Sequence, residues 1–403
     1  MFTSNFLVNL KYKENKLLIF IVFFLFLLIS LVFFTRYILM SKVKNGINVN
    51  KTKIIKVNIV PDALKIAKST LDWVDKQKDV RGIYTHAALC RLENPDICTP
   101  SVMDNRSEID VLWGRYKYFN TTKDQDELNK LINDITQYSN EVKIIQNNSW
   151  NCKLMYDLWN SNIFTIDQKT KIRDVCFKST YELAISPIIL VKVDESRLDI
   201  KIIDQNIKNK ISDILLDKNS DFNLEYKDTL ENKLNNYKYP FHTSDYLSRY
   251  KWEKNKKDLT FAYMFFDISL EDYIQNKNAI LPYQKCATGV AAVSFFDLTN
   301  DPDYIAVAKK ILFEDTKNLV LDQQSVAICS YLANDLYTTT KNNEYLNKKN
   351  EILQGFIKTN FDLNGYFGKL KGDGGFYTKG GDSYIKEVVS NSLLLGLLAD
   401  NHE

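Results

Sequence analysis

The chain has 403 residues, which is enough for one large domain or two smaller ones. Its 53 basic residues nearly balance its 50 acidic ones, so it lacks the strong positive charge of a dedicated nucleic-acid-binding protein. Glycine and proline are scarce, at 13 and 7 residues, which favours a helical protein.

A long apolar segment lies close to the N-terminus. Residues 17–34 contain one serine as their only polar residue and are long enough to span a bilayer. No small-residue cleavage site follows, so we expect an uncleaved transmembrane anchor over 17–40 rather than a signal peptide. Residues 1–16 are then a cytoplasmic tail, and residues 41–60 are a linker rich in lysine and asparagine.

The cysteines indicate on which side of the membrane the rest of the chain lies. In an antiparallel helical hairpin that turns near Phe164, Cys152 and Cys176 would face each other, and Cys90 and Cys98 flank a short loop. Two pairs that can form locally favour an oxidising compartment, so we expect an extracytoplasmic domain. The basic residues that follow the apolar segment weakly favour the opposite orientation. The alternative is therefore a domain that faces the cytosol and has free thiols.

From residue 61 onward, the apolar pattern predicts helices that alternate between a charged outer type and an inner type rich in small and apolar residues. The inner helices are expected to begin about 40 residues apart, a period that predicts an array of two-helix units. Residues 183–240 break this period and are interpreted as an insertion that starts with a β-hairpin or short helices. The predicted helices cover 62–77, 107–119, 123–146, 149–160, 166–182, 243–253, 258–276, 284–298, 302–315, 323–338, 342–358 and 383–400, and the inner ones begin near 107, 149, 243, 284, 323 and 383.

Two local motifs add to this pattern. The helix with Leu71-Asp72-Trp73-Val74 is followed by Gln77, Gly82 and Tyr84, and a loop near the C-terminus contains Gly372-Asp373-Gly374-Gly375-Phe376-Tyr377. Together with the repeated units, these turns resemble the α/α toroids of the six-hairpin glycosidase-like superfamily over residues 61–403. The resemblance implies an all-α (α/α)6 toroid of helical hairpins, which we expect to follow the one N-terminal transmembrane helix. Terpenoid-cyclase-like toroids have similar turns, but their acidic DxDD-type motif is absent here.

The resemblance also implies a cleft at one end of the inner helices, lined by residues near the starts of those helices. Sugar hydrolysis needs two carboxyl groups beside the scissile bond, one as acid and one as base or nucleophile. The catalytic candidates are Glu108, Asp110, Asp245 and Asp382. The candidates for binding substrate are Trp113, Arg115, Tyr246, Arg249, Trp252, Asp373, Tyr377 and Tyr384.

Each candidate also has a purely structural interpretation. Acids in the first turn of a helix are favoured by the helix dipole and by capping alone. Arg115 and Arg249 are placed to pair with such acids. Trp113, Trp150 and Trp252 fit core or cleft-wall packing better than stacking on sugars. The glycine-aromatic loop suits packing as well as ligand contact.

Other chemistries lack their motifs. The sequence has no HExxH, no CxxC and no Gly-x-Ser-x-Gly, and a calcium-loop pattern that starts at Asn360 has Lys371 where a glutamate is needed. We therefore expect no metal and no other cofactor. The sequence predicts a membrane-anchored carbohydrate-active protein, a glycoside hydrolase-like enzyme first and a polysaccharide lyase or epimerase next. The alternative is a non-catalytic toroid that binds cell-surface glycan or a protein partner.

Overall fold

The structure is a computed structural model, and its described residues belong to one compact unit, Val57–Glu403. The expected tail 1–16, the anchor 17–40 and nearly all of the linker 41–60 lie outside the described residues. Within the described part of the chain, no helix is long and apolar enough to cross a membrane. The described residues are 59–79, 82–85, 87–91, 98–101, 108–140, 150–184, 200–217, 239–314, 316–317, 322–361, 374–380 and 383–400.

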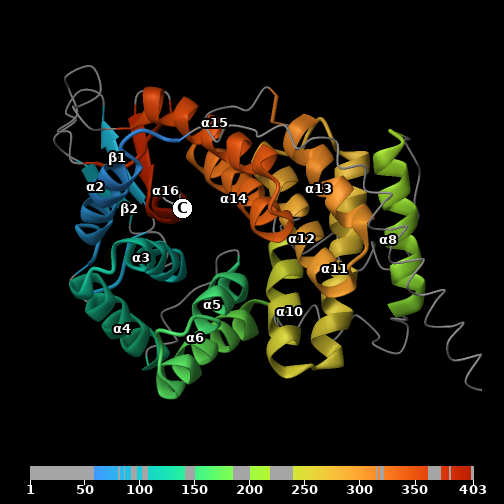
Figure 1. The fold of residues 1–403 in the computed structure, drawn as a ribbon, viewed down its shortest axis with the longest axis horizontal. Coiled ribbons are helices and arrows are strands. Elements are labelled where there is room, and N and C mark those ends of the chain that lie inside the picture. The colour runs from blue at the N-terminus through green and yellow to red at the C-terminus, as the bar shows by residue number, and fades with distance from the viewer. Residues whose placement is uncertain are drawn as a thin grey trace, which may run out of the picture. The chain divides into compact units, whose positions relative to one another are not determined.

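Six helices form a closed inner ring (Figure 1). Each one contacts the next along the chain, and the last contacts the first, so the ring has no open end. These helices are buried on nearly all sides, as their small and apolar residues predict. They are α3 (Glu108–Thr122), α5 (Asn151–Trp159), α10 (Tyr239–Glu253), α12 (Pro282–Thr299), α14 (Gln323–Thr340) and α16 (Val388–Ala399).

A second set of six helices packs around this ring. Each outer helix contacts at least one inner helix, and the first outer helix, α2, mainly contacts α16 at the other end of the chain. The six hairpins that the sequence predicted are therefore present, and each inner helix begins within five residues of its expected start. The outer helices are α2 (Ala63–Asp75), α4 (Gln125–Asn140), α6 (Ile166–Ala184), α11 (Lys256–Gln275), α13 (Pro302–Glu314) and α15 (Asn343–Asn360).

Four of the five turns that lead from an inner helix to the next outer helix share one design. After α3, α10, α12 and α14, the next residue adopts a left-handed conformation with φ between 56° and 58°. The residue after that is Asp or Asn, whose side chain accepts a hydrogen bond from a backbone N–H in the first turn of the outer helix. The longer connections lead from outer to inner helices and so lie at the N-terminal ends of the inner helices. The four turns are Lys123-Asp124, Lys254-Asn255, Asn300-Asp301 and Lys341-Asn342.

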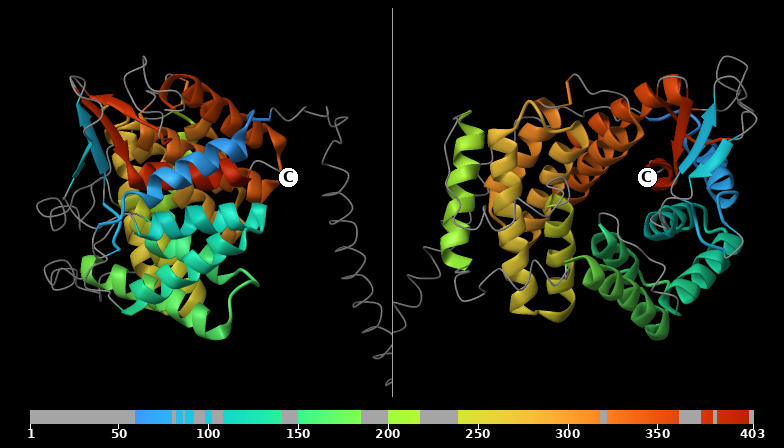
Figure 2. Two further views of the ribbon diagram at one scale, coloured as in Figure 1. Left: turned by 90° about the vertical axis from the view of Figure 1, so that its left-hand side faces the viewer. Right: turned by 180° about the vertical axis from the view of Figure 1, so that it is seen from behind.

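The prediction of an all-α fold is wrong in one respect, because the longest connections contain a small antiparallel sheet. Its order is β2 (Cys98–Ser101), β1 (Ala87–Arg91), β4 (Ser383–Glu387) and β3 (Thr378–Gly380). Figures 1 and 2 show the sheet beside α2 and α16. The helix expected over 383–400 consequently begins only at Val388, since residues 384–387 alternate between buried and partly exposed, as a strand does.

The insertion contributes one described helix, α8 (Ile200–Leu215), which packs against α11 and α13. The ammonium of Lys210 is fully buried there, 2.7 Å from a carboxylate oxygen of Asp267 and 3.3 Å from one of Glu271. A buried charge is tolerated when it is paired in this way. Residues 200–203, which were interpreted as strand or helix, are helical, while 185–199 and 218–238 lie outside the described residues.

Among the described residues, two disulfides join helices of the toroid. The predicted bond between Cys152 and Cys176 is confirmed and joins α5 to α6. A second bond, Cys286–Cys329, joins α12 to α14 and was not predicted as a pair. Cys90 and Cys98 lie opposite each other where β1 pairs with β2, as the short loop between them suggested, but their side chains are outside the described part.

Candidate functional site

Three of the predicted carboxylates gather near the N-terminal ends of α3 and α10. Glu108 and Asp110 lie in the first turn of α3, and Asp245 lies in the second turn of α10. Their exposed fractions are 1%, 1% and 3%, and the charges of Glu108 and Asp245 both act on Asp110. The ring therefore brings together acids that are 135 residues apart in the sequence, as Asp110 and Asp245 are.

Asp245 binds the N-terminus of the helix that lies between α3 and α10. One of its carboxylate oxygens accepts hydrogen bonds from the backbone N–H groups of Cys152, at 2.9 Å, and Lys153, at 3.1 Å. The first N–H groups of a helix have no partner inside that helix and carry a partial positive charge. Burial raises the pKa of Asp245 to about 7, although these donors and the charge of Arg249 act to lower it. The carboxyl group is thus set to titrate near neutral pH.

Asp110 has a different environment. Burial raises its pKa well above the usual range, and the neighbouring carboxylates of Glu108 and Asp245 raise it further. Among the described residues, its Oδ2 atom has no hydrogen-bond partner. Burial and two neighbouring carboxylates thus favour the protonated form of Asp110, whereas the backbone donors and Arg249 favour the ionised form of Asp245, so the two carboxyl groups have unlike environments.

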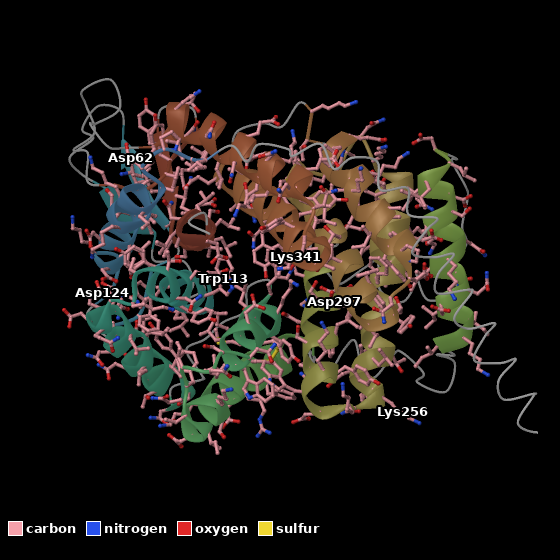
Figure 3. All side chains as sticks on the ribbon, in the orientation of Figure 1. Asp62, Trp113, Asp124, Lys256, Asp297 and Lys341 are labelled. Atoms are coloured by element: carbon pink, nitrogen blue, oxygen red, sulfur yellow. A yellow bond between two sulfur atoms is a disulfide. The ribbon has the colours of Figure 1, made fainter. Side chains whose placement is uncertain are left out.

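Aromatic rings lie across the inner ring of helices near this cluster. The ring of Tyr331, from α14, lies between Trp113, at 5.4 Å, and Trp150, at 4.7 Å, and the charge of Asp245 acts on its hydroxyl. Trp113 points from α3 toward the other inner helices (Figure 3) and donates from its indole nitrogen to Asp157 at 3.1 Å. These rings give the inside of the toroid an aromatic wall.

The side chain of Lys153 reaches from α5 across the inner ring of helices. The ammonium of Lys153 lies 3.0 Å from a carboxylate oxygen of Asp335 and 3.4 Å from the hydroxyl of Ser294. It also lies 5.7 Å from the centre of the Tyr331 ring. Lys153 thus connects α5 with α12 and α14, while its backbone N–H contacts Asp245 from α10.

Arg115 is not part of this cluster. Its guanidinium is fully buried and forms ion pairs with Glu127 and Asp75, and it donates to the hydroxyl of Tyr84 at 3.0 Å. The expected pairing with the acids of the first turn does not occur, because Arg115 lies about two helical turns beyond Glu108 and faces α2 and α4. In this structure Arg115 stabilises the packing of the first hairpins.

The candidates beyond Asp245 in α10 have packing and ion-pair partners of their own. Tyr246 stacks on aromatic rings of α11, and Trp252 packs against Trp159. Arg249 pairs with Asp258 at 3.2 Å, rather than with an acid in the first turn of its own helix. Arg249 and Trp252 follow Asp245 by about one and two helical turns and both contact the ring of Phe177 in α6, so these candidates pack against neighbouring helices.

The glycine-aromatic loop is described only in its second half. Tyr377 and Tyr384 pack at right angles, 5.5 Å apart, and both are buried, with the Tyr377 hydroxyl donating to the carbonyl of Thr359 at 2.8 Å. These contacts serve packing between the loop, β4 and α15. Asp373 and Asp382 lie outside the described residues.

Sequence reasoning missed Tyr331 and Lys153. Tyr331 is the one large side chain in the run from Val326 to Ala333 that otherwise consists of small and aliphatic residues, and that contrast could have marked it. Lys153 follows a cysteine that was considered only as a disulfide partner. Nothing in the local sequence shows that its side chain reaches two other helices.

Comparison with solved structures places this fold among known ones. The chain is similar to the GH76 α-mannanase of Bacteroides thetaiotaomicron, with 12% identity and a TM-score of 0.52 over 85% of this chain and 96% of that one. A glycoside hydrolase family 76 mannosidase of the same organism gives 11% identity and a TM-score of 0.51, covering 84% and 97%. A variant of unsaturated glucuronyl hydrolase from Streptococcus agalactiae gives 11% and 0.51, covering 88% and 95%.

No protein-family model and no curated protein matches this sequence. The similarity to solved structures spans nearly the whole of each of the three enzymes, so it concerns the complete fold rather than one hairpin. At such low identity it shows the fold alone. The chain has the six-hairpin glycosidase-like α/α-toroid fold.

Proposed function

We propose that this protein is a glycoside hydrolase-like enzyme that acts on a carbohydrate. The observation that supports the proposal is the buried pair Asp110 and Asp245, which the ring brings together and holds in two unlike environments. Enzymes that hydrolyse glycosidic bonds use two carboxyl groups, one protonated and one ionised. The aromatic rings of Trp113, Trp150 and Tyr331 lie near this pair and are themselves buried inside the toroid.

The environments assign one role to each carboxyl group. Its buried site favours the protonated form of Asp110, so it is the general acid that gives its proton to the oxygen of the leaving sugar. Asp245 accepts two backbone hydrogen bonds that favour its ionised form, so it is the base that takes a proton from water, or the nucleophile that attacks the anomeric carbon. Glu108 keeps the proton on Asp110 by adding negative charge beside it.

The proposal is tested with the full-length protein and a panel of glycans. The panel includes α-mannans and unsaturated glucuronyl oligosaccharides, because the names of the similar enzymes refer to these substrates. We expect one class to be hydrolysed, and both Asp110→Asn and Asp245→Asn to reduce kcat at least about a thousandfold. The matched control is Asp126→Asn, which changes an exposed acid in α4. Full activity of either site variant would refute the assignment.

We also propose that the domain is extracytoplasmic and is anchored by residues 17–40. The disulfides Cys152–Cys176 and Cys286–Cys329 support this, because such bonds persist in oxidising compartments. An Asp126→Cys variant provides the test, since residue 126 is exposed. On intact cells, a membrane-impermeant maleimide should label this variant, and labelling that requires lysis would place the domain in the cytosol.

A second function is favoured by one observation. None of Glu108, Asp110 and Asp245 is more than 3% exposed, so a non-catalytic toroid that binds glycan or a protein partner would keep these acids as packing groups. Such a protein would bind a glycan of the panel without hydrolysing it, and Asp245→Asn would leave that affinity unchanged.

A further inference from the structure

Cys152 has two roles at the proposed active site. Its side chain forms the disulfide with Cys176 of α6, and its backbone N–H donates to the Asp245 carboxylate at 2.9 Å. The same residue therefore contacts the carboxyl group of Asp245 in α10 through its backbone and is covalently bonded to α6 through its side chain. Both sulfur-bearing residues are fully buried, so the disulfide is shielded from solvent.

The N-terminal end of α5 needs contacts with other helices that hold it in place. The helix has nine residues, and Trp150 immediately before it has φ of 67°, in the left-handed region that is costly for a bulky side chain. A strained entry into a short helix persists only if its surroundings hold it in place. Two contacts with other helices hold the first turn of α5 in place. They are the disulfide to Cys176 and the ion pair of Lys153 with Asp335 across the ring.

We infer that the Cys152–Cys176 disulfide positions the Asp245 carboxyl group by fixing the first turn of α5 against α10. This inference rests on the proposed function, since it makes the disulfide part of the apparatus that orients a catalytic base. It also explains why the bond lies at the start of α5 rather than further along the hairpin: only the first N–H groups of a helix are available to an external carboxylate.

The second disulfide provides a matched control. Cys286–Cys329 also joins two helices of the toroid and is also buried. In the part of the chain that the structure describes, however, neither of its cysteines donates a hydrogen bond to the carboxylates of Glu108, Asp110 or Asp245. Removing either disulfide should lower the melting temperature, but only one removal should change Asp245 itself.

The test measures the pKa of Asp245 directly, without a substrate. Full-length protein in detergent micelles is labelled with 13C at aspartate side-chain carboxyls and titrated from about pH 4 to about pH 9, and the Asp245 signal is assigned by its loss in Asp245→Asn. In Cys152→Ala/Cys176→Ala, two donors that favour the carboxylate are displaced, so we expect its pKa to rise by at least about half a unit. In Cys286→Ala/Cys329→Ala it should stay at the wild-type value.

An unchanged or lowered pKa in the first variant, or an equal shift in both, would overturn the inference. If the first variant does not fold, the more conservative Cys152→Ser/Cys176→Ser variant takes its place in the same titration, and the same rise is expected. The outcome is independent of turnover. A shifted pKa in a protein that hydrolyses no glycan would refute the proposed function and leave the positioning role intact.

Discussion

At the scale of single residues, the most informative group is Asp245, because burial and hydrogen bonding act on it in opposite directions. Burial is the larger effect, and the pKa of its carboxyl group rises to about 7. In the unfolded chain an aspartate titrates near pH 3.9. The folded protein therefore binds a proton at Asp245 that the unfolded chain releases between these two values.

This difference predicts how stability depends on pH. The stabilisation from the protonated group is complete below about pH 4 and is lost as the pH rises through about 7, with a magnitude of up to about 4 kcal/mol. Asp245→Asn has no such proton, so its unfolding free energy should decline less between pH 4 and pH 7 than that of the wild type. Denaturant unfolding at several pH values measures this. Parallel curves for the two proteins would show that Asp245 is not perturbed, and Asp126→Asn should follow the wild type.

The sequence was a better guide to which residues lie in the candidate site than to which partners those residues contact. The first-turn acids Glu108 and Asp110 were chosen because they begin an inner helix, and they lie in the cluster. Arg115 was expected near the same acids, but it pairs with Glu127 and Asp75. The apolar pattern gives the period of a helix but not which neighbouring helix each polar side chain meets, and that choice decides whether an arginine binds a ligand or supports a fold.

At the scale of elements, the loop before β3 shows why its glycines are needed. Gly374 and Gly375 have φ of 89° and 81°, and they lie directly against Ser69 and Trp73 of α2. Asn391 of α16 completes the turn: its carbonyl oxygen accepts from the backbone N–H of Phe376 at 2.5 Å, and its amide donates to the carbonyl of Phe376 at 3.0 Å. The turn thus fastens the C-terminal strands to the first and last helices.

Two glycine substitutions test this interpretation. Gly374→Ala puts a Cβ atom against the backbone of Ser69 in a strained conformation, so it should lower the unfolding free energy by at least about 2 kcal/mol. Gly355→Ala lies within α15 and meets no atom within 4 Å, so it should raise that free energy by about 0.5–1 kcal/mol. Chemical denaturation measures both. Equal effects would mean that the loop before β3 can move to accommodate a side chain.

The elements themselves were largely predictable, and the exceptions have a physical reason. The helices follow from apolar periodicity, which is a local property. The sheet does not, because β1 pairs with β4 across almost 300 residues, and short strands show little pattern of their own. The turns such as Lys341-Asn342 repeat a signal that the sequence does contain: Asp or Asn follows one residue after an inner helix ends.

At the scale of the whole molecule, the two ends of the toroid domain close the ring on each other. α2 packs on α16, and α16 packs on α3 with Gly114 and Gly396 at their contact, where a Cβ atom on either would clash. A count of two-helix units predicts a closed ring but not which helices close it. That pairing depends on long-range packing, in which small residues let two helices approach closely.

The closed ring also explains how the proposed site forms. Asp110, Asp245 and the first turn of α5 come from three neighbouring helices, and the longer connections lie at the same ends of these helices. Sequence reasoning placed the candidate acids at this end because of the resemblance to other toroids. It could not show which of these acids meet, because the distance between carboxyl groups depends on how the ring closes. Asp382 lies outside the described residues.

The pH dependence of hydrolysis tests the central claim most directly. If Asp245 is the base, kcat/KM on a hydrolysed glycan should rise with pH through a midpoint near 7, where Asp245 ionises. Asp126→Asn should keep this profile, and Asp245→Asn should abolish it. An enzyme that is fully active at pH 5, with Asp245 still protonated, would contradict the account.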